Sequence, residues 1–251
     1  MKELDVAIKA AREAGKIMMR YFEKSYSTYT KDDSTPATDA DRECERTSVS
    51  IIKKHFPDHN FLGEEFKYEK TNSPFCWIID PIDGTKVFIR KMPYFGCSIG
   101  LEKNGKIILG VIYVPMMKML AFASKGKGAY LNGRRIKVSS TRKIENSYLI
   151  MGDIGKLYDK GYGKQLLSLM RKCYGYGGYA DLVGLIFVAR GNADINLIES
   201  HGPWDVAAAK IIIEEAGGKM TDFKGKDTIY SGESIATNGL LHKDVLKIFK
   251  K

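Results

Sequence analysis

The stretch Trp77-Ile78-Ile79-Asp80-Pro81-Ile82-Asp83-Gly84-Thr85 carries the most information about the fold and chemistry of this chain. Its first three residues form an apolar run before a turn signal, a pattern typical of the end of a buried strand. Asp80 and Asp83 then bring two carboxylates close together, which is unfavourable unless a cation lies between them. A hard divalent cation with oxygen ligands meets that need, and an ordinary Asp- and Gly-rich turn is the alternative. Thr85 stands at the start of a short predicted helix, where free main-chain N–H groups attract phosphate.

The composition is that of a globular protein. With 251 residues, 44% hydrophobic and 28% charged, the chain has material for one large domain or two tightly joined halves. The first five residues lack the apolar stretch of a signal peptide, and no apolar run approaches the ~20 residues that span a bilayer. The four cysteines form no CxxC pair, which indicates reduced thiols rather than a zinc site or disulfides. We therefore predict a cytoplasmic protein that does not associate with membranes.

The formal net charge of +10 suits an anionic partner. The lysines are spread over the whole chain. A basic stretch interleaved with aromatic residues, which would be typical of RNA binding, is absent from the sequence. An ordinary solvated surface accounts for most of this charge, and we do not expect nucleic acid as a partner.

The first half of the chain predicts two helices and a mostly antiparallel sheet. Apolar residues at helical spacing predict a helix over 3–24, and Thr38 with Asp41 three residues on predicts the start of a second helix that runs to about His55. Asn104-Gly105 and Asn132-Gly133 are hairpin signals. The predicted strands are 60–62, 75–79, 95–102, 107–114, 119–124 and 129–131.

After Ser139 strands and helices alternate, which favours an α/β second half. The predicted strands lie near 147–151, 174–177, 194–198, 219–222 and 234–237. The predicted helices lie at about 157–172, 181–190, 205–217 and 240–250. We predict an α+β protein of two halves, residues 1–139 and 140–251, with a cleft between them.

Further acids stand at the ends of predicted elements. Glu64 and Glu65 follow a short apolar strand, and Asp205 opens the helix after Gly202-Pro203-Trp204. Asp39 lies near the start of the second helix. A helix-capping role is the ordinary alternative for Asp39 and Asp205.

At these residues the chain resembles the inositol monophosphatase family of Mg²⁺-dependent, Li⁺-sensitive phosphomonoesterases, over nearly its whole length. Four stretches carry the resemblance: 36–41, 63–65, 77–90 and 204–218. Four motifs in the same order and spacing are far more specific than one. The resemblance implies a layered α/β/α/β/α sugar-phosphatase-like fold and, commonly, a homodimer.

The resemblance also implies roles for individual residues. The implied metal ligands are the carboxylates of Glu64, Asp80, Asp83 and Asp205 and the main-chain carbonyl of Ile82. The implied catalytic residues are Glu64 and Thr85, which hold the attacking water, and Asp39. Lys31 matches a position further from the metals. The N–H groups of Gly84 and Thr85 match the phosphate-binding groups. The first half thus holds most of the ligands, and the second half provides Asp205 and the substrate pocket.

Two or three Mg²⁺ ions, with Mn²⁺ as a substitute, make chemical sense with these ligands. A phosphate dianion repels hydroxide, so one ion must lower the pKa of a bound water and another must stabilise the leaving alkoxide in an in-line displacement. Scattered carboxylates suit Mg²⁺, which keeps several waters and substrate oxygens.

The substrate is less clearly indicated. Inositol monophosphate or a related sugar or polyol phosphate is the first choice, with Glu199 near the position of a carboxylate that binds the leaving alcohol in relatives. Lys86 and Asp181 are similar to the histidinol-phosphate phosphatase branch, where an acid would suit the substrate ammonium; Asp181 could equally cap a helix. Fructose 1,6-bisphosphate is a third candidate. A non-catalytic member of the fold that binds RNA or protein is the alternative from another class, and the intact acids favour an enzyme over it.

Overall fold

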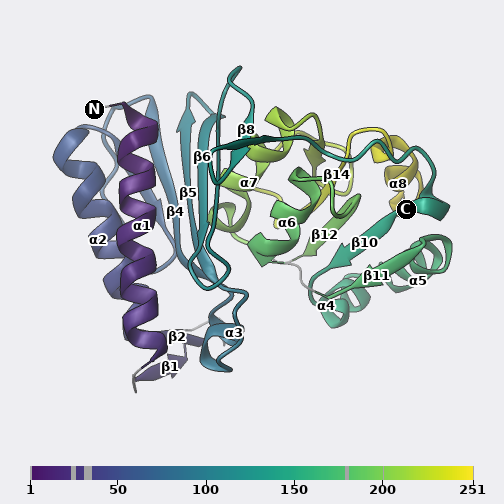
Figure 1. The fold of residues 1–251 in the computed structure, drawn as a ribbon, viewed down its shortest axis with the longest axis horizontal. Helices are drawn as coiled ribbons and strands as arrows, with labels where there is room; N and C mark the ends of the chain where they lie inside the picture. Colours follow the sequence, from purple (N-terminus) through teal and green to yellow (C-terminus); the bar gives the residue numbers. More distant parts are fainter. Residues whose placement is uncertain (1, 24–26, 31–35, 179–180, 200, 251) are drawn as a thin grey trace.

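The computed structural model describes residues 2–23, 27–30, 36–178, 181–199 and 201–250. Helices and sheets alternate across the molecule in the order α/β/α/β/α (Figure 1). This is the predicted layering. Helices α1 and α2 cover the outer face of a seven-stranded sheet, and α6 and α7 lie between that sheet and a five-stranded one. Helices α4, α5 and α8 lie on the far side of the second sheet.

The two N-terminal helices form as predicted. Helix α1 spans Glu3–Phe22 and α2 spans Asp39–His55. Thr38 caps α2, because its Oγ1 accepts the N–H of Ala40 while Asp41 accepts the N–H of Thr38 at 2.7 Å. The apolar face of α1 is buried against β5 and β6 and against α2, as a stripe at helical spacing requires.

The seven-stranded sheet has the order β3-β4-β5-β6-β7-β8-β9. Only β3 and β4 pair in parallel within it, and its other pairs are antiparallel. Its strands are β3 (Asn60–Gly63), β4 (Phe75–Asp83), β5 (Gly96–Lys103), β6 (Lys106–Val114), β7 (Met119–Ser124), β8 (Ala129–Leu131) and β9 (Arg134–Ile136). Both predicted hairpins are confirmed: Asn104 and Gly105 have φ of 50° and 75°, and Asn132 and Gly133 have 50° and 78°.

The five-stranded sheet has the order β11-β10-β12-β14-β13, with β10 parallel to both its neighbours and the other pairs antiparallel. Its strands are β10 (Tyr148–Met151), β11 (Gly175–Gly177), β12 (Ile195–Glu199), β13 (Lys219–Thr221) and β14 (Glu233–Thr237). The helices of this half are α4 (Ile154–Asp159), α5 (Gly163–Lys172), α6 (Asp181–Ala189), α7 (Pro203–Glu215) and α8 (His242–Phe249).

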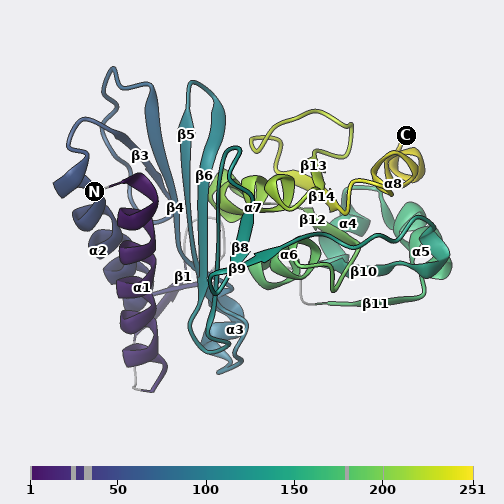
Figure 2. The ribbon, with the colours of Figure 1, turned by 45° about the horizontal axis from the view of Figure 1, so that its top comes forward.

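Helix α7 belongs to the second half by sequence but packs against the first sheet (Figure 2). Gly100 and Gly110 are opposite each other on β5 and β6 and lie beneath it. A Cβ on Gly100 would lie 2.9 Å from the Cβ of Ala207, and one on Gly110 would lie 2.4 Å from the carbonyl oxygen of Ala208. The absent side chains let the helix lie directly on the strands, which brings its N-terminal end to the edge of β4. The division at residue 139 stays a prediction.

Three features differ from the sequence prediction. The helix predicted over 157–172 is two helices, α4 and α5, because Gly161 between them has φ of 79°. Strand β4 continues past Ile79 to Asp83, with a register shift between Asp80 and Asp83. Short elements were not predicted at β1 (Thr28–Thr30), β2 (Pro36–Thr38), β9 and a 3-10 turn over Ile144–Asn146. The polar stretch 31–36 predicts a loop, and residues 31–35 lie outside the described residues.

The structure also bears on two predictions made from composition, which concern the cysteines and membrane-spanning helices. Cys44, Cys76, Cys97 and Cys173 are free thiols, as predicted. In the described part of the chain, every helix is too short or too polar to cross a bilayer.

Candidate metal centre

Parallel pairing of β3 with β4 brings the first two acids to one edge of the sheet. Gly63 is the partner of Ile79 in this pair, so the next residues along each strand, Glu64 and Asp80, emerge side by side. The ladder between the two parallel strands ends at this pair, so the next residue of each chain lies at the same edge of the ladder. Glu64 directly follows β3, whereas Asp80 lies within β4, which continues to Asp83.

Strand β5 brings the third acid from the other half of the chain. Ser98 lies opposite Asp80 in the β4–β5 ladder, and its Oγ donates a hydrogen bond to the carbonyl of Trp204 at 3.1 Å. Trp204 directly precedes Asp205 in the first turn of α7. The N–H of Gly202 donates to Asp205 Oδ2 at 2.5 Å, so one oxygen of this carboxylate is held by the helix start. Asp205 thus caps its helix and faces Asp80.

Three carboxylates meet at this point. One oxygen from each of Asp80, Asp83 and Asp205 lies within 4.8 Å of the other two. Asp80 is 1% exposed, and among the described residues no hydrogen-bond partner reaches either of its oxygens. Burial, followed by the charges of Glu64, Asp83 and Asp205, raises the pKa of Asp80 well above its ordinary value. Asp205 is 122 positions from Asp83 and 125 from Asp80 in the sequence, so the fold brings these acids together at considerable electrostatic cost.

This arrangement fits a hard divalent cation. Asp80 offers two buried oxygens that lack donors, and oxygen-only ligands are what Mg²⁺ prefers. A cation would remove the repulsion that raises the pKa of Asp80. Ile82 is 1% exposed, and its carbonyl oxygen accepts from Thr85 Oγ1 at 3.0 Å, which leaves one lone pair for another partner.

Glu64 lies beside this cluster but is not one of the three acids within 4.8 Å of each other. Its charge raises the pKa of Asp80 and also that of Asp41, so its carboxylate is within electrostatic reach of both. The side chain is partly exposed.

Asp41 contacts Thr85, a relationship that sequence reasoning missed. Thr85 Oγ1 donates to Asp41 Oδ1 at 3.2 Å, and Asp41 Oδ2 accepts from the N–H and Oγ1 of Thr38. Burial raises the pKa of Asp41 to about 7. The spacing of Thr38 and Asp41 was interpreted as a helix start only, and nothing in it pointed to residue 85, 44 positions away.

Asp39, the acid assigned to catalysis from the sequence, has a different position. It is the exposed first residue of α2, and it lies close enough to Tyr21 to influence its pKa. Within the described part of the chain, no hydrogen bond joins Asp39 to Thr85 or to the three clustered acids, whereas Asp41 does contact Thr85. The role assigned to Asp39 stays an untested prediction, and the geometry favours Asp41 for it.

The other residues predicted for the site are Gly84, Glu199, Lys31 and Asp181. Gly84 has φ of 86° and caps the short helix α3 (Thr85–Ile89), where a Cβ would lie 2.9 Å from the carbonyl of Tyr94. Glu199 ends β12 and is 5% exposed; its Oε1 accepts the N–H of Asp153 at 3.0 Å, and burial raises its pKa to about 7. Lys31 and the side chain of Asp181 lie outside the described residues.

The comparisons with known proteins identify the family. The model of the inositol monophosphatase family matches residues 1–251. The chain belongs to this family. Its relatives include a histidinol-phosphatase of Chlorobaculum parvum, 36% identical over 236 residues, which are 94% of this chain and 91% of the relative.

Two further relatives of this inositol monophosphatase family member cover almost its whole length. A fructose-1,6-bisphosphatase/inositol-1-monophosphatase of Thermotoga maritima is 35% identical over 99% of this chain and 96% of its own. The crystal structure of extragenic suppressor protein suhB from Bartonella henselae superposes with a TM-score of 0.92, at 31% identity and 98% coverage of both chains. The predicted fold class and family are therefore confirmed.

Proposed function

We propose that this protein is a Mg²⁺-dependent phosphatase that hydrolyses phosphate monoesters of inositol or a related sugar or polyol. The observation that carries the proposal is the cluster of Asp80, Asp83 and Asp205 beside the hydrogen-bonded pair of Thr85 and Asp41. Carboxylates brought together at one point repel each other unless a cation neutralises them, and such a cation can assist the attack of water on a phosphate ester.

The acids would hold two or three Mg²⁺ ions, with Mn²⁺ as a substitute. Glu64, Asp80, Asp83, Asp205 and the carbonyl of Ile82 would supply the protein ligands. When bound, the ions supply positive charge to the phosphate oxygens and lower the pKa of a water at the site.

Thr85 and Asp41 would orient that water. The Thr85 hydroxyl donates its one proton toward Asp41 or Ile82, so its oxygen lone pairs are available to accept a hydrogen bond from the water. Asp41 is itself held by Thr38, so its carboxylate stays in place beside the Thr85 hydroxyl. The carboxylate of Glu64 would share the water with Thr85, and the N–H groups of Gly84 and Thr85 would bind the phosphate.

Histidinol phosphate is the second candidate substrate. The relative of Chlorobaculum parvum is named a histidinol-phosphatase, and Lys86 and Asp181 resemble that branch. An Asp181 carboxylate facing the substrate ammonium would be worth about 1.5–3 kcal/mol. Asp181→Asn would then lower kcat/KM for histidinol phosphate about 10-fold or more relative to inositol 1-phosphate. Equal losses of kcat/KM for both substrates would indicate that Asp181 only caps its helix.

A phosphate-release panel tests the function. The purified protein is assayed with inositol 1-phosphate, histidinol phosphate and fructose 1,6-bisphosphate, the last because the Thermotoga relative carries that activity in its name. We expect turnover that requires Mg²⁺, is abolished by chelation and is lost in Asp80→Asn. A folded protein that releases no phosphate from any of them with Mg²⁺ or Mn²⁺ would overturn the proposal. A homodimer, inhibition by Li⁺ and a cytoplasmic location are further expectations from the family.

A further inference from the structure

A buried carboxylate on α2, that of Glu45, lies behind the candidate metal centre. It is 0% exposed. Its Oε2 accepts the N–H of Glu65 at 2.9 Å, and its Oε1 accepts the N–H of Phe66 at 3.1 Å and the hydroxyl of Tyr68 at 2.8 Å. All three donors belong to the segment that directly follows Glu64.

The residue before Glu64 also meets this carboxylate. A Cβ built on Gly63 would lie 2.0 Å from Glu45 Oε1, so no side chain larger than that of glycine fits there while Glu45 keeps its place. Glu45 therefore touches the chain on both sides of Glu64. Gly63 in turn is fixed by its pairing with Ile79, the residue before Asp80.

Stability alone is a poor explanation for this acid. Burial raises the pKa of Glu45, and the charge of Glu65 adds to the effect, while the hydrogen bonds from Glu65, Phe66 and Tyr68 lower it. A buried carboxylate near other acids is unfavourable even when it is hydrogen-bonded. What the arrangement provides is a segment held next to Glu64 by two main-chain N–H groups and one side-chain hydroxyl.

We propose that Glu45 is a positioning residue of the metal centre, which holds the segment around Glu64 so that the Glu64 carboxylate stays beside Asp80. Glu64 alone would be repelled by the neighbouring acids and would turn toward solvent, since it is partly exposed. With the turn fixed in advance, the cation meets a ligand already in place and no ordering entropy is lost on binding. The inference rests on the proposed function in taking Glu64 as a ligand.

The variant Glu45→Gln tests the role. Glutamine keeps the volume but has one carbonyl oxygen, so its NH₂ group must face one of the two main-chain N–H donors and that anchor is lost. Groups that hold metal ligands in place typically change affinity 10- to 100-fold when removed. We expect Glu45→Gln to bind Mn²⁺, measured calorimetrically without substrate, about 10- to 100-fold more weakly than the unaltered protein.

Glu43→Gln is the matched control on the same helix. The Glu43 carboxylate accepts hydrogen bonds from Arg20 and Tyr21 on α1, rather than from residues 63–68. We expect its Mn²⁺ affinity to stay within about 2-fold of the unaltered protein, because an exposed pair contributes little. In phosphate release, Glu45→Gln should need more Mg²⁺ for half-maximal rate while kcat at saturating Mg²⁺ recovers. A merely structural role would lower the melting temperature and leave the affinity for Mn²⁺ unchanged, which would overturn the proposal.

A measurement on the unaltered protein covers the case in which the variant does not fold. Amide hydrogen exchange at Glu65 and Phe66, without metal, should be slowed relative to exposed loop amides, and unprotected exchange there would overturn the proposal. Failure of the proposed function is distinguishable. If the protein hydrolyses no phosphate ester but its Mn²⁺ affinity depends on Glu45, the proposed function is wrong and the positioning role of Glu45 is supported. If the protein hydrolyses phosphate esters but Glu45→Gln binds Mn²⁺ normally, only the positioning role is wrong.

Discussion

The Asp83 carboxylate accepts a hydrogen bond from the main-chain N–H of Leu182, with Oδ2 and N separated by 3.1 Å. Asp83 ends β4 in the first sheet, and Leu182 lies in the first turn of α6. The bond joins the metal centre to the helix layer between the two sheets. It holds the Asp83 carboxylate in place, and one oxygen of this carboxylate lies within 4.8 Å of an oxygen of Asp80 and of Asp205.

Asp83→Asn should abolish phosphatase activity and leave the fold intact. Asparagine has nearly the same volume, and its carbonyl oxygen can still accept from Leu182, but the cluster loses a negative charge and a cation ligand. Repulsion among the acids falls in the metal-free protein, so its stability should not decrease. The measurements are kcat at saturating Mg²⁺ and thermal unfolding without metal. Near-normal turnover would remove Asp83 from the site, and Asp244→Asn on the exposed face of α8 is the control for loss of charge.

Thr85→Ala should lower kcat about 10²-fold or more, whereas Thr85→Ser should keep most of the activity. The prediction depends on the hydroxyl, which lies 3.2 Å from Asp41 Oδ1 and which serine retains. Mg²⁺ affinity should change little in either variant, because the assigned ligands remain. Steady-state kinetics over a range of Mg²⁺ concentrations measures both quantities. An alanine variant as active as the serine variant would mean that the water is held by other groups.

His242 should make the protein less stable as the pH falls from about 6.5 to 4. The imidazole is 1% exposed; burial and the charges of Lys219 and Lys210 lower its pKa from the ordinary 6.5 to about 4. Thr221 Oγ1 donates to the carbonyl of Asp222, so it accepts from His242 Nε2–H at 2.9 Å, and Nδ1 then accepts from Thr237 Oγ1. Both contacts use the neutral ring.

The sign follows from proton binding. Between pH 6.5 and 4 the unfolded chain binds a proton at His242 that the folded protein does not, so the free energy of unfolding decreases as the pH falls, with a slope approaching about 1.4 kcal/mol per pH unit. Denaturant unfolding at several pH values should show a flatter dependence in His242→Gln than in the unaltered protein. Parallel curves would show that His242 takes up a proton in the folded state.

The parts of the fold set by local chemistry were predictable from sequence. The hairpins at Asn104-Gly105 and Asn132-Gly133 need left-handed φ angles that these residues adopt readily, and the start of α2 follows from the cap of Thr38 by Asp41. The convergence of Asp80, Asp83 and Asp205 was inferred from motifs, and the structure brings these three together. The break between α4 and α5 was missed because the apolar spacing continues through Gly161.

Contacts between distant segments left no trace in the sequence pattern. The bond from Ser98 to Trp204 spans 106 positions, and that from Thr85 to Asp41 spans 44. In the sequence alone, Ser98 looks like an ordinary strand residue and Asp41 like an ordinary helix-capping residue. Only the pairing of β4 with β5 and the packing of α2 make them part of the site.

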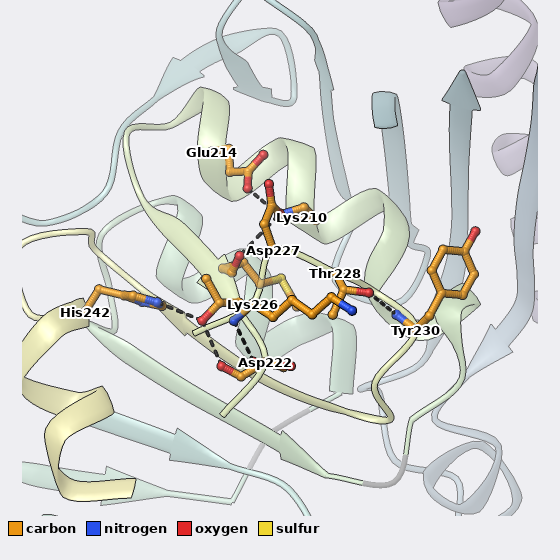
Figure 3. Close-up of polar contacts among 10 residues, drawn as sticks. Lys210, Glu214, Asp222, Lys226, Asp227, Thr228, Tyr230 and His242 are labelled. Carbon is orange, nitrogen blue, oxygen red and sulfur yellow. Dashed lines mark hydrogen bonds and ion pairs between the residues drawn. The ribbon is translucent and has the colours of Figure 1, made fainter. Parts of the chain in front are cut away.

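The loop 222–232, between β13 and β14, is tied down by a buried lysine (Figure 3). Lys210 on α7 is 8% exposed, and its Nζ donates to the carbonyl of Met220 and pairs with Asp227 and Glu214 at 2.5 Å each. Further along the loop, the Tyr230 hydroxyl donates to Glu102 on β5 at 2.7 Å. Lys210 therefore holds the start of a loop that reaches across to the first sheet.

Lys210→Met should destabilise the protein by about 1–3 kcal/mol and loosen this loop. Methionine fills the space, but the buried carbonyl of Met220 loses its donor, whereas Glu214 and Asp227 are exposed enough to be solvated. Lys224 and Lys226 lie in the loop, and the Asp222 carboxylate accepts both their N–H groups, so trypsin should cleave there faster in the variant. Lys247→Met, which removes an exposed pair with Asp244, is the control and should change stability by less than about 0.5 kcal/mol. Equal stability and equal cleavage rates in the two variants would show that the loop is held by its own turn and by Tyr230 rather than by Lys210.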